Sequence, residues 1–122
     1  MFELIVKGEF SAAHNLRHYQ GKCERLHGHN YQVELFCRQM KLNKLGMVID
    51  FTVLKALMDE ILNEYDHKYL NELKDFKALN PTAENIARAI HAKFQNQLPK
   101  SLKLKVCIWE SAKTGASYSN AL

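Results

Sequence analysis

The chain has 122 residues, which is enough for one folded domain with its own core, and we predict a single domain over residues 1–122. Charged residues at 25% and apolar residues at 47% are ordinary globular values, and no apolar run approaches the roughly 20 residues of a membrane span, so we expect no membrane partner. The net charge of +4 comes without a basic stripe between aromatic residues, which disfavours a nucleic-acid partner and suits an anionic small molecule.

Two strands are predicted in the first third of the chain. Residues Phe2 to Phe10 are rich in apolar and β-branched side chains. Residues Asn30 to Met40 alternate between apolar and polar side chains, which is typical of a half-buried strand. The polar segment from Asn15 to Lys22 lies between them, and we expect a functional loop there.

Two helices are predicted after a turn at Leu42 to Gly46 and a short extended piece, Met47 to Ile49. Asp50 is a typical helix N-cap, and apolar residues follow it at helical spacing. These residues are Phe51, Leu54, Leu57, Met58, Ile61, Leu62 and Tyr65. The second helix begins near Asn80-Pro81-Thr82, carries Ile86, Ile90 and Phe94 on one side, and ends before Pro99.

The last two strands complete the predicted fold. Residues Leu102 to Trp109 alternate as a strand does, and Ser117 to Leu122 would pair back onto it after a turn at Gly115. The resulting order predicts an α+β fold, in which a four-stranded antiparallel sheet carries two antiparallel helices on one face. Such a small sheet has two free edges, which closure into an oligomeric barrel would remove.

Three histidines indicate a metal site. His14 follows the first strand, and His27 and His29 flank Gly28. In an extended chain, residues two apart share a face, so His27 and His29 can direct their imidazoles at one point. A third histidine from a neighbouring strand would complete a three-nitrogen zinc site with an open fourth position, which is the form that catalytic zinc takes. We therefore predict one Zn²⁺ per subunit on these three residues.

Cys23 lies four residues before His27 and leaves alternatives open. It could be a fourth zinc ligand, a nucleophile or base beside the metal, or a small buried residue. Its loop position near a predicted metal site favours a reactive thiolate. Cys37 and Cys107 fall in predicted strands, where we expect packing roles. An odd number of cysteines without CxxC spacing fits a reducing cytoplasm, where we expect the protein to be.

Asp66-His67 and Glu110 are further candidates for chemistry. A carboxylate near an imidazole can orient it for proton transfer, but adjacent residues do not necessarily point at each other. Glu110 ends a strand and could either cap a turn or bind a guanidine-like ring edge with paired hydrogen bonds. We expect His18 to be a loop residue and His91 a helix-surface residue, both without a metal role.

Together these residues resemble the 6-pyruvoyl-tetrahydropterin synthase superfamily, and within it the 6-carboxy-tetrahydropterin synthase branch of the queuosine (7-deazaguanine) pathway. The matching segments span nearly the whole chain in the family's order. They are Phe10-Ser11-Ala12-Ala13-His14, Cys23-x-x-x-His27-Gly28-His29, Met47-Val48-Ile49-Asp50-Phe51, Asp66-His67, Pro81-Thr82-Ala83-Glu84-Asn85 and Trp109-Glu110. The three residues between Cys23 and His27 resemble the queuosine branch, because the animal-type enzymes have a longer gap there.

The resemblance implies the tunnelling fold (T-fold), in which a trimer closes a twelve-stranded barrel and two trimers stack into a hexamer. It implies zinc on the three histidines and Cys23 as the proton acceptor. It also implies that Asp66 and His67 enter the site from a neighbouring subunit. Glu110 would bind the pyrimidine edge of a pterin and join the proton relay, and Thr82 would lie near the pterin.

The implied reaction converts 7,8-dihydroneopterin triphosphate to 6-carboxy-5,6,7,8-tetrahydropterin, acetaldehyde and triphosphate. Basic residues near the loop, such as Arg17, Lys22 or Lys68, are candidates for the triphosphate, and nothing in the sequence ranks them. A 6-pyruvoyl-tetrahydropterin synthase activity is an alternative within the same family.

Glu24 directly follows Cys23 and opens a second alternative. A related branch that cleaves dihydroneopterin to 6-hydroxymethyl-dihydropterin for folate synthesis uses a glutamate near this place, and Cys-Glu-x-x-His-Gly-His resembles members that do both reactions. Glu24 could equally be a solvated loop residue. A different class of protein, a non-catalytic zinc-stabilised binding domain, would instead use Cys23 to close the zinc site.

Overall fold

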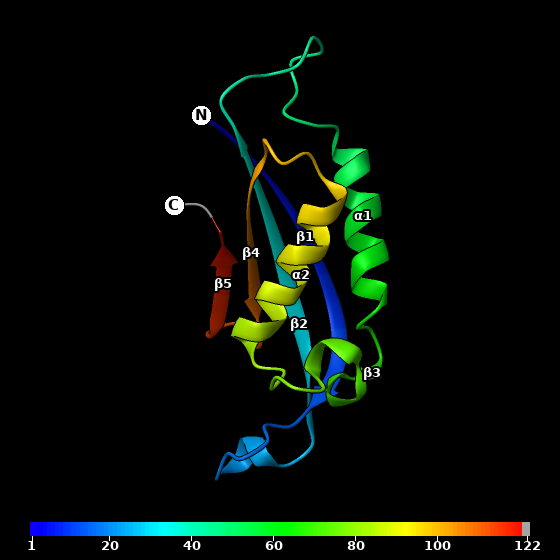
Figure 1. Cartoon of the computed structure of the whole chain (residues 1–122), viewed down its shortest axis with the longest axis vertical. Helices are drawn as coiled ribbons and strands as arrows, with labels where there is room; N and C mark the ends of the chain where they lie inside the picture. The colour runs from blue at the N-terminus through cyan, green and yellow to red at the C-terminus, as the bar shows by residue number, and fades with distance from the viewer. Residues whose placement is uncertain (121–122) are drawn as a thin grey trace.

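The computed structural model describes residues 1–120, which fold into a sheet with two helices on one face (Figure 1). The strands are β1 (Phe2–His14), β2 (His27–Gln39), β3 (Lys68–Tyr69), β4 (Lys103–Trp109) and β5 (Gly115–Ser119), in the spatial order β3-β1-β2-β4-β5. The helices α1 (Phe51–Asn63) and α2 (Ala83–Gln97) run in opposite directions across the same face. This is the predicted α+β architecture with one additional strand.

The additional strand makes the sheet mixed rather than purely antiparallel. β3 runs parallel to β1, with Ala12 opposite Lys68 and Ala13 opposite Tyr69. All other pairs in the described sheet are antiparallel, as predicted. A strand of two residues has no alternation that a sequence pattern could reveal. It directly follows His67, one of the predicted site residues.

β1 and β2 are longer than the sequence pattern predicted. β1 continues past Phe10 to His14, and β2 begins at His27 rather than Asn30. The added residues are mostly small or polar and have weak strand propensity, but cross-strand pairing continues through them to the His14–His27 pair. All three histidines therefore belong to the rigid ladder and not to the loop between the strands.

Both helices begin near the residues that the sequence indicated, and each has a side-chain N-cap. The Asp50 carboxylate accepts a hydrogen bond of 2.9 Å from the amide of Thr52 at the start of α1. The Thr82 hydroxyl accepts one of 3.1 Å from the amide of Asn85 at the start of α2, so the helix begins just after Pro81. Neither helix among the described residues is both long and apolar enough to cross a membrane.

Alternation along the strands places the core between the sheet and the helices. Tyr31, Val33, Leu35 and Cys37 of β2 are fully buried on the face that the helices cover, so the packing role expected for Cys37 is confirmed. The largest fully buried side chains come from both layers and are Tyr31, Tyr65, Phe10, Phe76, Phe94, Leu35, Leu54, Met58, Leu70, Ile86, Ile90 and Leu104. The opposite face of the sheet, here called the open face, carries polar pairs such as Trp109 donating to Glu34 at 2.7 Å.

Three local expectations were wrong. His91, expected on the surface of α2, is only 3% exposed and lies edge-on to Tyr118 at 4.9 Å, because α2 packs against β5. Residues 48–49 form bends, so the short extended piece expected over residues 47–49 is absent. β5 begins at Gly115, where a turn was expected, and a Cβ atom there would lie 2.7 Å from the Trp109 ring. The predicted end of that strand, residues 121–122, lies outside the described residues.

Candidate metal centre and active site

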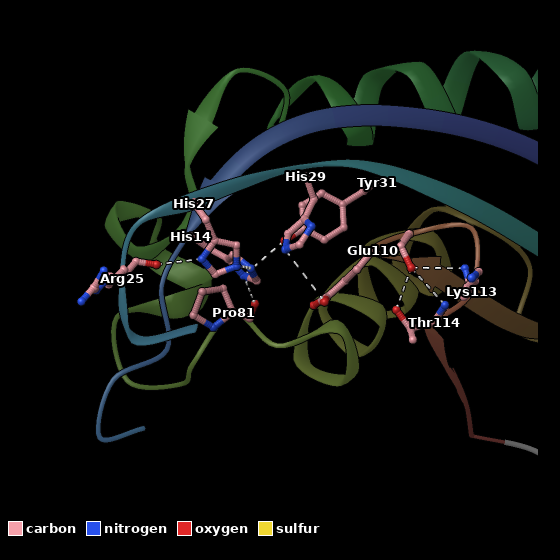
Figure 2. Close-up of polar contacts among 10 residues, drawn as sticks. His14, Arg25, His27, His29, Tyr31, Pro81, Glu110, Lys113 and Thr114 are labelled. Atoms are coloured by element: carbon pink, nitrogen blue, oxygen red, sulfur yellow. Dashed lines mark hydrogen bonds and ion pairs between the residues drawn. The ribbon is translucent and has the colours of Figure 1, made fainter. Parts of the chain in front are cut away.

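The three histidines lie together at one end of the β1–β2 ladder (Figure 2). His14 is the direct cross-strand partner of His27, and His29 lies two residues further along β2 on the same face. The imidazole centroids are 4.5 Å apart for His14 and His27, 4.9 Å for His14 and His29, and 4.8 Å for His27 and His29. One possible ligand atom from each ring lies within 4.8 Å of the others, so this group could hold a metal ion.

Main-chain carbonyls set the tautomers of two of these rings. Nδ1 of His14 lies 2.7 Å from the carbonyl oxygen of Pro81, and Nδ1 of His27 lies 2.7 Å from that of Arg25. A carbonyl oxygen only accepts hydrogen bonds, so each Nδ1 carries the ring proton and each Nε2 presents a lone pair. These two Nε2 atoms are 2.9 Å apart. Two lone pairs at this distance repel each other unless a proton or a metal ion lies between or beside them.

The third histidine, His29, also has the features of a metal ligand. Its Nε2 atom is buried and has no hydrogen-bond partner among the described residues. Burial lowers the pKa of both His14 and His29, which favours the neutral ring that binds metals. Three converging imidazoles, one with an orphaned buried nitrogen, fit a borderline transition metal such as zinc.

Cys23 lies in a short 3-10 turn, Lys22–Glu24, immediately before β2. Its side chain is half-buried, and its carbonyl oxygen accepts a hydrogen bond of 2.7 Å from the amide of Leu16. Cys23 does not belong to the group of converging ligand atoms, which among the described residues contains only the three histidines. The local geometry therefore disfavours Cys23 as a fourth ligand, and a role beside the metal stays a prediction.

Asp66 and His67 form a pair at the edge of β1. Oδ2 of Asp66 lies 3.0 Å from Nδ1 of His67, while Oδ1 accepts a hydrogen bond of 2.9 Å from the amide of Ser11. The hydrogen bond from Ser11, the largest cause, and the nearby His67 lower the pKa of Asp66. The amide of His67 donates to the carbonyl of Ser11 at 2.6 Å, and the backbone of His67 has a positive φ of 59°.

This pair does not join the converging ligand atoms of its own chain. The His67 side chain is 83% exposed, and none of its atoms is among the converging ligand atoms. The edge of β1 thus holds an oriented imidazole that projects into solvent. Such an imidazole is available to a second molecule.

Glu110 directly follows β4 and reaches toward the histidines. Its Oε2 atom lies 3.9 Å from Nε2 of His29 (Figure 2). The main-chain amide of Glu110 donates to the carbonyl of Thr114 at 3.1 Å. The side chain is 30% exposed, so a ligand can reach the carboxylate. The structure therefore places the Glu110 carboxylate beside the histidine group, and its contact with a ligand stays a prediction.

Thr82 and Glu24 have local roles in the fold. The Thr82 hydroxyl caps α2, as described above. Glu24 is exposed, and its carbonyl oxygen accepts a hydrogen bond of 3.3 Å from the side-chain amide of Asn15. A direct contact of either side chain with a ligand stays a prediction.

Arg17 and four partners that no motif indicated hold the loop beside the metal site. The Arg17 guanidinium donates to the carbonyl oxygens of Asn71, Phe76 and Leu79 at 3.1, 2.8 and 3.3 Å. Its main-chain amide and carbonyl bond both ends of the Asn80 side-chain amide at 2.8 and 3.1 Å. The Arg17 guanidinium therefore donates its hydrogen bonds to main-chain carbonyls of the fold, which weakens its candidacy as a residue that binds the triphosphate. These contacts of Arg17 join segments that lie far apart in the sequence, so no local sequence pattern could have predicted them.

Comparisons with known proteins find similar sequences over most of the chain. Residues 3–121 match the family model described as 6-pyruvoyl tetrahydropterin synthase. A 6-carboxy-5,6,7,8-tetrahydropterin synthase of Synechocystis is 43% identical over 100 residues, which cover 78% of this chain and 76% of that protein. A dihydroneopterin monophosphate aldolase of Pyrococcus furiosus is 36% identical over 113 residues, which cover 92% of each chain.

A solved structure supports the fold. The 6-pyruvoyl tetrahydropterin synthase of Caenorhabditis elegans superposes with a TM-score of 0.88 at 31% identity, and the match covers 98% of this chain and 96% of that one. The fold, the three converging histidines and the matched sequence together define a T-fold pterin enzyme of the lyase type. The chain belongs to the 6-pyruvoyl tetrahydropterin synthase family, which confirms the resemblance read from its motifs.

Proposed function

We propose that this chain is a zinc-dependent lyase that converts 7,8-dihydroneopterin triphosphate to 6-carboxy-5,6,7,8-tetrahydropterin in queuosine biosynthesis. The observation that carries the proposal is the histidine group, in which main-chain carbonyls fix two Nε2 lone pairs toward each other while Cys23 stays outside. Two relatives of this chain with substantial coverage are named for pterin chemistry, and one carries the name of this activity.

The overall reaction balances without an external oxidant or reductant. The three-carbon side chain is cleaved between its first and second carbons, leaving a carboxylate on the ring and releasing the other two carbons as acetaldehyde. One water is consumed as triphosphate leaves. The two electrons lost by the side chain reduce the dihydropterin ring to the tetrahydro state. The reaction therefore needs acid–base groups and charge stabilisation, both of which the site can provide.

His14, His27 and His29 would hold the zinc ion, which supplies Lewis-acid stabilisation of negative charge on the side-chain hydroxyl oxygens. Cys23, on the turn before β2, removes a proton from the three-carbon side chain of the substrate. His67, oriented by Asp66, gives and accepts protons at Nε2. Glu110 accepts hydrogen bonds from the guanidine-like edge of the pterin, and its 3.9 Å separation from His29 supports a pterin lying beside the metal site.

The exposure of His67 supports a shared active site in a homohexamer. The Asp66–His67 pair is built onto the edge of β1 and is 83% exposed at His67, so it can reach the site of an adjacent copy. β1 has a strand partner on its outer side only at residues 12–13 among the described residues, and β5 is the opposite edge of the sheet. Pairing of these edges between copies would close a barrel and bring His67 to the neighbouring histidines.

A direct assay tests the proposal. Purified protein loaded with zinc is incubated with 7,8-dihydroneopterin triphosphate, and the products are identified by mass. We expect 6-carboxy-tetrahydropterin and acetaldehyde in equal amounts. A product that retains all three side-chain carbons would indicate 6-pyruvoyl-tetrahydropterin synthase activity instead. If the protein holds zinc but converts no pterin, the lyase proposal is wrong and the non-catalytic binding domain is favoured.

A second candidate function is cleavage of dihydroneopterin, or its monophosphate, to 6-hydroxymethyl-dihydropterin for folate synthesis. The relative named dihydroneopterin monophosphate aldolase supports it, since it matches 92% of this chain. Glu24 is the residue of interest, because it is exposed on the same turn as Cys23. The same assay with these two substrates tests for a dual-function enzyme. The three free cysteines support a reducing cytoplasm as the location of either reaction.

A further inference from the structure

Tyr31 connects the hydrophobic core to the histidine group. It lies on β2 two residues after His29, on the same face, and is fully buried. Its ring stacks on Phe10 with a centroid distance of 4.8 Å and an interplanar angle of 15°. The same ring meets the imidazoles of His14 and His29 edge-on, at 5.9 and 5.3 Å. Tyr31 is therefore both a core residue and a wall of the metal site (Figure 2).

The hydroxyl of Tyr31 reaches the nitrogen that sets the tautomer of His14. It lies 3.2 Å from Nδ1 of His14, the same atom that lies 2.7 Å from the Pro81 carbonyl oxygen. The single Nδ1 proton is thus flanked by two oxygens, with the shorter bond to the carbonyl. Rotation of the imidazole about its Cβ–Cγ bond would break both contacts and turn Nε2 away from the other histidines.

We propose that Tyr31 is a positioning residue of the metal centre, whose hydroxyl and ring hold the His14 imidazole with Nε2 facing His27. This inference rests on the proposed function only in requiring that the three histidines bind zinc. The physical reason is preorganisation: a ligand whose orientation is fixed before the metal arrives loses less conformational freedom on binding. His14 is the buried member of the group, so its ring has no contact with bulk water that could replace these restraints.

The test uses Tyr31→Phe, which removes one oxygen atom and keeps the stacked ring. Zinc affinity is measured on the purified protein by competition with a chromophoric chelator, independently of any enzyme assay. We expect affinity about tenfold weaker than that of the wild type, at the low end of the effect of losing an outer-shell partner. The matched control is Tyr65→Phe, another buried tyrosine, whose hydroxyl donates to Asp75 at 2.7 Å outside the metal site.

A second measurement separates positioning from a general loss of stability. The ¹⁵N chemical shifts of the His14 imidazole in the metal-free protein report which nitrogen carries the proton. Because the Pro81 carbonyl remains in every variant, we expect the Nδ1–H form in all three proteins. We expect broadened His14 imidazole signals, from a ring that samples more than one orientation, only in Tyr31→Phe. Equal zinc affinity in wild type and Tyr31→Phe, or an equal loss in Tyr65→Phe, would overturn the proposal.

The outcomes also separate this inference from the proposed function. A wild-type protein that binds no zinc overturns both. Zinc binding that weakens only in Tyr31→Phe, in a protein without lyase activity, supports the role of Tyr31 and contradicts the lyase assignment. Lyase activity together with unchanged zinc affinity in Tyr31→Phe contradicts the role of Tyr31 alone.

Discussion

Nε2 of His14 lies 2.9 Å from Nε2 of His27, and the opposite nitrogen of each ring is bonded to a main-chain carbonyl. Because His14 and His27 are direct partners in the β1–β2 ladder, the sheet itself imposes this proximity. Strand pairing and hydrogen bonds to the main chain thus orient both imidazoles as ligands. The first two predictions follow from this arrangement and from the position of Cys23 outside it.

His27→Ala and His29→Ala should each lose zinc and activity together. Each change leaves two imidazoles, which cannot provide the three-ligand geometry of a catalytic zinc site. We expect the loss of affinity to exceed the roughly 10–100-fold cost of losing an outer-shell partner. The measurements are metal content after dialysis and turnover of the triphosphate substrate. Retention of stoichiometric zinc and normal turnover in either variant would show that the metal assignment is wrong.

Cys23→Ala should retain zinc but lose activity. The thiol lies outside the histidine group, so its removal leaves the ligands in place while a general base is lost, at a cost of about 10²–10⁴ in rate. Metal content and turnover are again measured on the same preparation. If this variant loses zinc as the histidine variants do, Cys23 is a ligand and the site is of the closed, structural kind.

A mixture of two inactive variants should recover activity if the sites are shared. Subunits carrying Cys23→Ala and subunits carrying His67→Ala are each expected to be inactive alone. After exchange, some interfaces combine an intact Cys23 with an intact His67 from different chains. Activity is measured after exchange has been verified by native mass spectrometry, with unmixed samples as the control. Verified mixed oligomers that stay inactive would count against the shared site.

Glu24→Ala should distinguish the two candidate reactions. If Glu24 is the base for cleaving dihydroneopterin, its removal should suppress formation of 6-hydroxymethyl-dihydropterin by about 10²-fold or more. Formation of 6-carboxy-tetrahydropterin should remain largely intact, since Cys23 is unchanged. Both products are quantified from parallel assays. A wild-type protein that forms no hydroxymethyl product would remove the dual-function hypothesis and leave Glu24 as a solvated loop residue.

Stability should fall in mildly acidic solution partly because of His91. Burial lowers the pKa of this imidazole below its ordinary value of 6.5 in the folded state. The unfolded chain therefore binds the proton more readily, so the contribution of His91 to stability is complete above pH 6.5 and is lost as pH falls through the folded-state pKa. His14 and His29 shift in the same direction, so the test compares wild type with His91→Gln, both free of metal.

The free energy of unfolding is measured by denaturant titration between pH 5 and pH 7.5. We expect a smaller decrease toward low pH in His91→Gln than in the wild type, because Gln does not titrate. Parallel pH dependence in the two proteins would mean that His91 makes no such contribution.

Much of the architecture and most of the proposed site residues could be predicted from the sequence. Alternation in β2 and β4, and capping residues at Asp50 and Thr82, determine local structure through interactions between residues close in the chain. The spacing of His27 and His29 predicts a shared face by the same local geometry. His14 is predicted as the third ligand because it follows the neighbouring predicted strand.

Only the tertiary structure decided what depends on contacts between distant segments. No local sequence pattern reveals the short strand β3, the burial of His91 beneath β5, the long-range contacts of Arg17 or the exposure of the His67 imidazole. The role inferred for Tyr31 is intermediate, because alternation places it on the face of His29 but cannot show that its hydroxyl reaches Nδ1 of His14. Periodicity determines which face of an element a side chain occupies, whereas its partners depend on how the elements pack.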